Sequence, residues 1–517
     1  MAVGEPQEKP ARDLEDPEWI AAQKSYLRKL DWIILPMISL LYFFEYLDRG
    51  NIAPAKTDDK RLQNAKLYGY AEGHLTATQG AGNGHEPLSD SEWQLCVMMF
   101  YVGLVLFQVP GCIGYRIFPP SKWVAFGVCG WCAVSVLQCI VYNLSGALAC
   151  RFFLGMFEGL FGTGVLYYLS IWYHRTEMGV RVFWFLGPTA FAGAFGGLIA
   201  YGIGHIKSHI PVWKYLFLIE GIPGFCLGLL CLWWLPDRPE KNSRFSGIHQ
   251  EIAVARYRNE MFDKSQRIEM KHIIWTITDW RLYLQVAVYL PTAGMLSSIS
   301  GFLPTVVRSK LPHQYDSHVQ YTDEIPKDLG YHEPTQANLM TVPPYVCAFV
   351  LMYITSWTSD RVRERGLHCT ALATVAAVAY ALLAFLPESA LAGKYACICI
   401  AVACVYSTYP PSHAWATNNF GNETKRAIGA GLYTALGNLG SIAGTWFYPS
   451  KDAPQFRKGH LICMCLAIAT AVFALTNSLL LRAVNNHRDK KHGKPDPSAV
   501  VDVTELGDKT PSFRFIT

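Results

Sequence analysis

Long apolar runs recur along most of the chain, and shorter polar segments separate them. A helix needs roughly 20 apolar residues to cross a hydrocarbon core of about 30 Å. A soluble protein could bury a few such runs, but not a dozen. We therefore predict an all-α membrane protein with twelve transmembrane helices. These span about residues 31–53, 93–113, 122–142, 146–172, 182–204, 213–235, 281–304, 336–356, 367–387, 394–416, 427–447 and 460–482.

The longest polar interruption, residues 236–279, separates the sixth apolar run from the seventh and carries charges of both signs. We interpret it as a linker between two six-helix bundles, and the remaining residues as terminal tails. Two other connecting segments, 54–92 and 305–335, are also long and of mixed charge, and the first has no predicted role. The predicted units are residues 1–30, 31–235, 236–279, 280–482 and 483–517.

Lys and Arg concentrate in alternate short connecting segments, in the linker and in the tails. Such positive segments usually face the cytoplasm. For a chain that crosses the membrane twelve times, this places both termini and the linker in the cytoplasm. The residues that carry this pattern are Arg116, Lys122, Arg175, Arg181, Arg361, Arg363, Arg365, Lys425, Arg426, Arg482, Arg488, Lys490 and Lys491.

The two halves share an internal repeat. A charged segment after the fourth predicted helix precedes Gly193-x-x-x-Gly197, and a charged segment after the tenth precedes Gly440-x-x-x-Gly444. Small residues four apart let membrane helices approach closely. Their recurrence at matching places is typical of transporters built from two parallel repeats around a central site.

Composition excludes several classes of function. Only 16% of residues are charged, against roughly 25% in soluble domains. The net charge is only +5, and the Lys and Arg residues lie between the apolar runs, so no nucleic-acid partner is expected. Cys129 and Cys132 form a C-x-x-C within a predicted membrane helix, where inert buried thiols are favoured over a metal or redox site. No phosphate-binding loop or catalytic motif occurs in a fitting context. We expect no enzyme activity, metal or cofactor.

The first predicted helix carries Glu45, Asp48 and Arg49 within an otherwise apolar run. Spacings of three and four residues place them on one helix face. A charge in the membrane costs about 2.5–3.5 kcal/mol, so such groups are rare unless they face a partner or a wet cavity. Asp48 and Arg49 either mark the helix end near the headgroups or form a site where Arg49 binds an anion and the acids exchange protons. We favour the site, because residues 51–53 can continue the helix.

The fourth predicted helix carries Arg151 and Glu158, which lie two turns apart on one face, about 10.5 Å along the axis. Glu158 falls near the middle of the membrane, where a carboxylate is a candidate functional group. Glu158 either exchanges protons, with Arg151 contributing to anion binding, or forms a fixed structural pair with an arginine.

Polar and aromatic side chains crowd the tenth predicted helix, which contains Pro410 and Pro411. We predict that this helix lines a substrate site. For His413 a packing role is an equal alternative. The candidate substrate contacts here are Tyr409, His413, Trp415, Asn418 and Asn419.

Several motifs carry a family resemblance. They are Leu47-Asp48-Arg49-Gly50-Asn51-Ile52, Arg151-Phe152-x-Leu154-Gly155-x-Phe157-Glu158, Trp357-Thr358-Ser359-Asp360-Arg361 and Ala414-Trp415-x-x-Asn418-Asn419. In this order and spacing, residues 30–480 resemble the fungal anion:cation symporters of the major facilitator superfamily, the group of allantoate, nicotinate and pantothenate permeases.

The resemblance implies the major facilitator fold and proton-coupled movement of a small organic anion, a carboxylate such as a vitamin or ureide. In related bacterial sugar-acid transporters, the residues that match Asp48 and Glu158 are protonation sites, and the one that matches Arg49 is a substrate ligand. The resemblance also implies a plasma-membrane location, and we expect a monomer.

Glu45 departs from the family pattern, which often has Asn there. This extra acid would repel an anion unless it is protonated or paired with Arg49. Two alternatives stay open: an efflux carrier for a secondary metabolite of a biosynthetic cluster, and a non-transporting nutrient sensor. The short tails disfavour the sensor.

Overall fold

The computed structural model describes residues 17–50, 90–141, 143–204, 212–241, 244–260, 269–308, 340–387, 390–449, 452, 455–495 and 501–517. Most of the two long connecting segments and the first part of the N-terminal tail lie outside these residues. So do residues 51–53, and with them the predicted continuation of the first helix.

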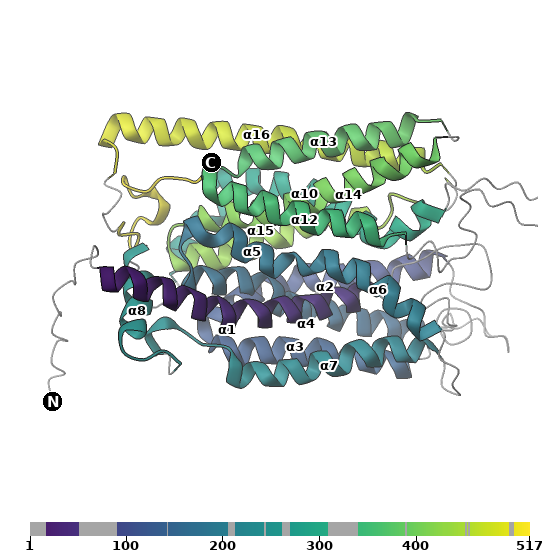
Figure 1. Cartoon of the computed structure of the whole chain (residues 1–517), viewed down its shortest axis with the longest axis horizontal. Helices are drawn as coiled ribbons and strands as arrows, with labels where there is room; N and C mark the ends of the chain where they lie inside the picture. Colours follow the sequence, from purple (N-terminus) through teal and green to yellow (C-terminus); the bar gives the residue numbers. More distant parts are fainter. Residues whose placement is uncertain are drawn as a thin grey trace, which may run out of the picture.

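Long helices make up both halves (Figure 1). Each of the twelve predicted spans overlaps a helix or helix pair in the described residues. The first half contains α1 (Pro17–Gly50), α2 (Asp90–Ile117), α3 (Pro120–Leu137), α4 (Leu144–Trp172), α5 (Met178–Leu186), α6 (Pro188–Gly204) and α7 (Val212–Trp234). The second half contains α10 (Trp280–Arg308), α12 (Val342–Val362), α13 (Gly366–Phe385), α14 (Leu391–Asn418), α15 (Glu423–Gly444) and α16 (Arg457–His492).

Ten of these helical segments are long and apolar enough to cross a membrane, with α5 and the start of α6 counted as one. The fifth predicted span is split at Gly187 and Pro188. Proline has no backbone N–H to continue the hydrogen-bond ladder, and it is favoured in the first turn of a helix. The break therefore follows from the local sequence.

Within the first half α2 packs along α4 and α3 along α7, and within the second half α13 packs along α16 and α10 along α15. The halves meet where α2 contacts α15 and where α5 and α6 contact α12. The predicted linker contains two further helices, α8 (Ile248–Glu260) and α9 (Met270–Ile277). We call the end of the molecule where α1 begins and α8 lies the linker end (left in Figure 1).

Glycines allow the predicted close approach of helices. A Cβ atom built on Gly440 of α15 would lie 2.0 Å from the carbonyl oxygen of Leu290 in α10. On Gly444 it would lie 2.3 Å from the carbonyl oxygen of Gly294. Backbone atoms cannot move aside as a flexible side chain can, so α10 and α15 can pack this closely only without side chains at these positions.

We expect Gly440→Ala to destabilise the protein by about 1–3 kcal/mol, because the added methyl group would push α10 away from α15. Thermal unfolding in detergent measures this effect. Gly393→Ala, on α14, is the matched control, since its added methyl group would lie 3.8 Å from the nearest side-chain atom of Leu386. An equal loss of stability in both variants would contradict the close-packing argument.

Candidate functional site

A buried cluster of charges joins α1 to α4. Arg49 Nη2 lies 2.9 Å from Glu45 Oε1 on its own helix and 2.9 Å from Glu158 Oε2 on α4. Glu45 and Glu158 are 2% and 0% exposed, whereas the Arg49 side chain is 17% exposed. One guanidinium therefore holds two buried carboxylates and still reaches an open space. We call these three residues the charge cluster.

The position of Arg49 argues against the interpretation that it caps α1 at the headgroups. α1 is described as far as Gly50, and the Arg49 side chain lies against the rings of Tyr46 and Phe100, with its charge centre 5.5 and 5.1 Å from their centroids. It is directed into the protein, where two acids bind it. The ion pair that the structure shows for Glu158 is therefore with α1.

The charge balance of the cluster depends on protonation. With both glutamates ionised it carries one net negative charge, and with one glutamate protonated it is neutral. A net charge buried away from water is unfavourable. Hydrogen bonds from a charged donor to a carboxylate are stronger than hydrogen bonds between neutral groups. The cluster is thus suited to take up and release a proton.

Asp48 and Arg151 lie behind this cluster. Asp48 is 1% exposed and accepts a hydrogen bond of 2.7 Å from Ser135 Oγ, which joins its carboxylate to α3. Arg151 is 2% exposed on α4 and interacts electrostatically with Asp48. Both are buried charged groups, but neither lines the cavity described next.

The charge cluster opens onto a central cavity between the halves. Two hollows of about 380 and 390 Å³ have Arg49, Tyr289, Tyr409 and Asn438 in both of their walls. Further lining residues are Tyr42, Glu45, Tyr46, Tyr101, Gln108, Glu158, Thr163, Ser297, Ser300, Tyr406, His413, Thr434 and Ser441.

Tyr409 and His413 line the cavity, as the sequence analysis predicted. His413 Nδ1 lies 3.0 Å from the carbonyl oxygen of Tyr409, and its ring packs against Tyr289 and Tyr409 with centroids 4.6 and 4.3 Å apart. The histidine therefore has packing contacts and a place in the cavity wall at once, so its two interpretations are not exclusive.

Hydroxyl groups join the halves across the cavity. The hydroxyl oxygens of Tyr46 on α1 and Tyr406 on α14 lie 2.8 Å apart, and those of Tyr42 and Tyr409 lie 3.3 Å apart. Tyr42 and Tyr46 were not among the predicted site residues, although they are spaced four residues apart on the helix of the charge cluster. Tyr289 was not predicted either, because no charged residue stands near it in the sequence.

Three more predicted substrate contacts, at the end of α14, lie outside the cavity as Arg151 does. Asn418 Nδ2 donates to the carbonyl oxygen of Arg175 at 2.8 Å. Trp415 Nε1 and Asn419 Nδ2 donate to the carbonyl oxygen of Ile516 at 2.8 and 2.9 Å. These side chains lie near the end of α14, outside the cavity lining, and bind backbone. We do not include them in the proposed substrate site.

Polar contacts between the halves close the linker end. Asp360 at the end of α12 accepts hydrogen bonds of 2.9 Å from the backbone N–H groups of Gly179 and Val180. Arg426 at the start of α15 donates to Ser170 of α4, with a distance of 3.2 Å to its carbonyl oxygen. These contacts must break if the halves separate at this end.

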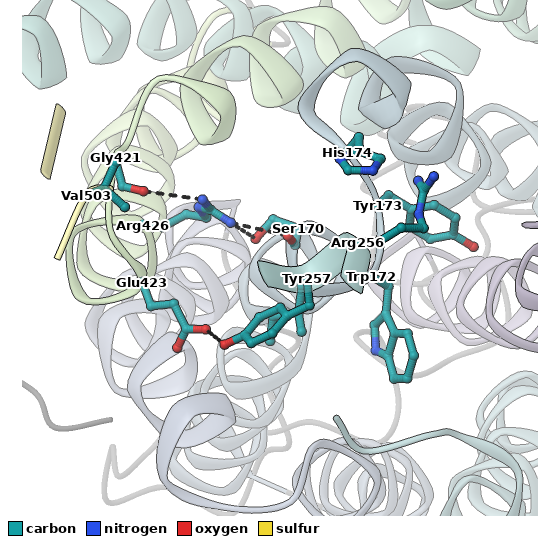
Figure 2. Close-up of a pocket in the computed structure, with 11 residues that line it drawn as sticks. Ser170, Trp172, Tyr173, His174, Arg256, Tyr257, Gly421, Glu423, Arg426 and Val503 are labelled. Atoms are coloured by element: carbon teal, nitrogen blue, oxygen red, sulfur yellow. Dashed lines mark hydrogen bonds between the residues drawn. The ribbon is translucent and has the colours of Figure 1, made fainter. Parts of the chain in front are cut away.

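A third hollow, of about 420 Å³, lies among the same contacts (Figure 2). Figure 2 shows Glu423 directed at Tyr257 of α8, to which it is hydrogen-bonded. Burial and the charge of Glu423 raise the pKa of the Tyr257 hydroxyl above its usual value. Arg256 pairs with Glu177 at 2.7 Å. Because these polar groups bind one another, we interpret this hollow as part of the contact between α4, α8 and α15.

The described residues contain no group of three His, Cys, Asp or Glu side chains placed to hold a metal ion. Cys129 and Cys132 are free thiols, partly and fully buried, and Cys129 Sγ lies 3.8 Å from the carbonyl oxygen of Phe225. The charge cluster and the cavity therefore remain the main candidate site.

A family model and related sequences match this chain over most of its length. The family model described as Major Facilitator Superfamily matches residues 38–445. The MFS transporter prlL of Fungal sp. (strain NRRL 50135) is 32% identical over 465 residues, which cover 89% of this chain and 86% of that protein. The major facilitator-type transporter hxnP of Emericella nidulans is 28% identical, over 96% of this chain and 93% of its own length.

Solved structures share the arrangement of helices. The proton:xylose symporter XylE aligns with a TM-score of 0.61 at 14% identity, over 93% of this chain and 98% of that one. The fucose:proton symporter FucP of E. coli aligns with a TM-score of 0.59 at 13% identity, over 86% and 99%. At this level of identity the likeness concerns the fold alone.

Proposed function

Because this chain belongs to the major facilitator superfamily, we propose that it is a proton-coupled secondary transporter of a small organic anion. Its relatives are named as transporters, so it is not an enzyme. The observation that carries the proposal is Arg49, which two buried glutamates hold at the wall of a central cavity. We place the protein in the anion:cation symporter group and in the plasma membrane, with both termini cytoplasmic.

Protonation of a glutamate is the step that makes Arg49 available. While Glu45 and Glu158 are both ionised, they compete with any anion for one guanidinium. A proton on either acid removes one charge-assisted hydrogen bond, and a substrate carboxylate can then take its place from the cavity. The bound state has the same charge balance as the empty, ionised cluster. Anion binding is thereby linked to proton uptake, and each ligand strengthens binding of the other.

The remaining cavity residues would orient the substrate. The hydroxyl groups of Tyr46 and Tyr409 and the amide of Asn438 can donate or accept hydrogen bonds. Asp48 and Arg151 support the site from behind, where Arg151 offsets the charge of Asp48. We propose Asp48 as a further proton acceptor, because burial makes its charged form unfavourable.

Uptake into proteoliposomes tests the proposal. With the inside alkaline by two pH units, we expect accumulation of at least one of nicotinate, pantothenate and allantoate, the solutes for which the similar permeases are named. One proton per anion would support up to about 100-fold accumulation, since each pH unit is worth about 1.4 kcal/mol. The ionophore nigericin, which collapses the gradient, should abolish the accumulation. No gradient-driven movement of any carboxylate would refute the function.

One observation favours a second candidate, export in exchange for protons. Two acids already pair with Arg49, so the ionised charge cluster has a net negative charge. It would therefore also accept a cationic or neutral solute, and protonation of the cluster would then displace that solute. Reversing the pH gradient in the same vesicles separates the two. A symporter accumulates its solute on the alkaline side, whereas an exchanger accumulates it on the acidic side.

A further inference from the structure

Residues 501–517, part of the predicted C-terminal tail, fold back onto the linker end of the molecule. Val503, Phe513 and Phe515 are 0%, 1% and 4% exposed and belong to one apolar cluster with residues of the second half. We call residues 501–517 the strap. Burial of this kind is expected of a bound segment rather than a free tail.

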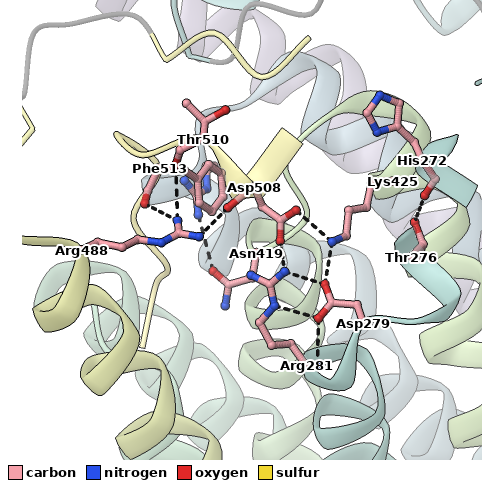
Figure 3. A network of polar contacts seen from close by, with 11 residues as sticks. His272, Thr276, Asp279, Arg281, Asn419, Lys425, Arg488, Asp508, Thr510 and Phe513 are labelled. Carbon is pink, nitrogen blue, oxygen red and sulfur yellow. Dashed lines mark hydrogen bonds and ion pairs between the residues drawn. The ribbon is translucent and has the colours of Figure 1, made fainter. Parts of the chain in front are cut away.

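Asp508 is the charged anchor of the strap (Figure 3). It is 1% exposed, lies 2.8 Å from Lys425 Nζ and forms an ion pair with Arg281. The same two cations bind Asp279 at 2.6 and 2.7 Å, so the buried network balances two acids against two bases. Burial alone would raise the pKa of Asp279, but hydrogen bonds and charge from Arg281 and Lys425 outweigh it and lower the pKa.

Side chains of the second half recognise the backbone of the strap. Asn419 accepts from the N–H of Ile516 and donates to its carbonyl oxygen, both at 2.9 Å. Asn485 of α16 binds both backbone groups of Phe515 in the same way, at 2.9 and 2.8 Å. Trp415 adds a second donor to the carbonyl oxygen of Ile516. This arrangement is a binding site for an extended peptide, and it accounts for polar residues on α14 that the cavity does not use.

Arg175, in the connection between α4 and α5, links the strap to the first half. Its charge centre lies 4.6 Å from the ring centroid of Phe513, and Nη2 donates to the carbonyl oxygen of Arg514 at 3.3 Å. Its own carbonyl oxygen accepts from Asn418 at 2.8 Å and from Arg365 at 3.2 Å. The strap therefore extends the contact between the halves that closes this end.

We propose that the strap binds in this site to hold the linker end closed, and that its contacts with Arg175, through the Phe513 ring and the Arg514 carbonyl oxygen, cross between the halves. Separation of the halves at this end must pull Arg175 off the ring. The strap thus shifts the balance of conformations toward the closed state and sets how often this end opens. The inference does not depend on which solute is carried or on proton coupling.

Phe513→Leu in the full-length protein tests the strap. Leucine keeps the apolar volume but loses the cation–π contact, which is worth about 0.5–2 kcal/mol. We expect the ratio of open to closed molecules at the linker end to rise roughly twofold to thirtyfold, which is that energy converted at 1.4 kcal/mol per factor of ten. Single-molecule energy transfer between fluorophores attached through unnatural amino acids at the exposed Glu240 and Asn486 measures this ratio in nanodiscs.

Phe515→Leu is the matched control, because its ring lies over Arg281 and Arg488, both of the second half. It should lower thermal stability and leave the open-to-closed ratio unchanged. Phe513→Tyr keeps the cation–π contact and should behave as wild type, even if the leucine variant folds poorly. An unchanged ratio in Phe513→Leu, or an equal shift in both leucine variants, would overturn the proposal.

Discussion

Replacing Arg49 with lysine is expected to lower transport about 100-fold or more while leaving the protein folded. Lysine keeps the positive charge, so Glu45 and Glu158 stay neutralised. It lacks the planar fork that can hold carboxylates at several nitrogen atoms at once. Loss of one or two hydrogen bonds to charged groups, at about 1.5–3 kcal/mol each, corresponds to this fall. Counterflow of radiolabelled substrate in proteoliposomes measures it without a driving gradient.

Arg457→Lys controls for a general effect of removing a guanidinium. Arg457 is exposed at the start of α16 and lies outside the cavity lining, so its replacement should leave counterflow unchanged. Thermal unfolding of Arg49→Lys should stay within a few degrees of wild type, because no buried charge loses its partner. Wild-type counterflow in Arg49→Lys would remove Arg49 from the substrate site.

The fold was largely predictable because membrane helices leave a strong signal. Every predicted span corresponds to a helix in the described residues, and family membership confirms the major facilitator fold with its two six-helix bundles. A search for apolar runs does not detect helices that lie outside the membrane. It missed α8 and the last ten residues of α16, Ala483–His492, since both are too polar for an apolar-run criterion. It also missed the strap, whose aromatic residues Phe513 and Phe515 are too few to suggest burial.

The site was only partly predictable because local spacing constrains contacts within a helix but not between helices. The spacing of Glu45 and Arg49 predicted their pair, and the structure shows it. The spacing of Arg151 and Glu158 suggested a similar pair, whereas the structure binds Glu158 to a residue 109 positions earlier in the chain. Which helix faces α4 depends on how the first bundle packs.

Polar and aromatic side chains of α14 also lie in two different sites. Tyr409 and His413 lie two to nine residues before Trp415 and Asn418, and all four looked alike as polar or aromatic residues on the tenth predicted helix. The cavity reaches only the first two. The end of α14 lies beyond the cavity, among the polar contacts at the linker end. Nothing in the sequence shows where along α14 the cavity stops.

Replacing Glu158 with glutamine is expected to abolish accumulation driven by a pH gradient while exchange continues. Glutamine has nearly the shape of a protonated glutamic acid, so Arg49 becomes available to the anion without a proton. Under a gradient of two pH units, accumulation should fall from as much as about 100-fold to near unity, because no proton moves with the substrate. The apparent affinity for substrate should also stop rising as the pH is lowered. Accumulation and substrate affinity measured between pH 5 and 8 check both effects.

Glu45→Gln gives the contrast that assigns protons to residues. If Glu158 alone couples, the Glu45 variant should still accumulate substrate, with tighter binding at neutral pH because one competing charge on Arg49 is gone. If both acids carry a proton with each monoanion, wild-type transport moves one net positive charge. A membrane potential of 100 mV, worth about 2.3 kcal/mol per charge, should then increase accumulation roughly fifty-fold in wild type and not in Glu45→Gln. Glu240→Gln, an exposed acid of the linker, should match wild type in every assay. Unaltered pH dependence in both cluster variants would mean that the charge cluster does not couple protons to transport.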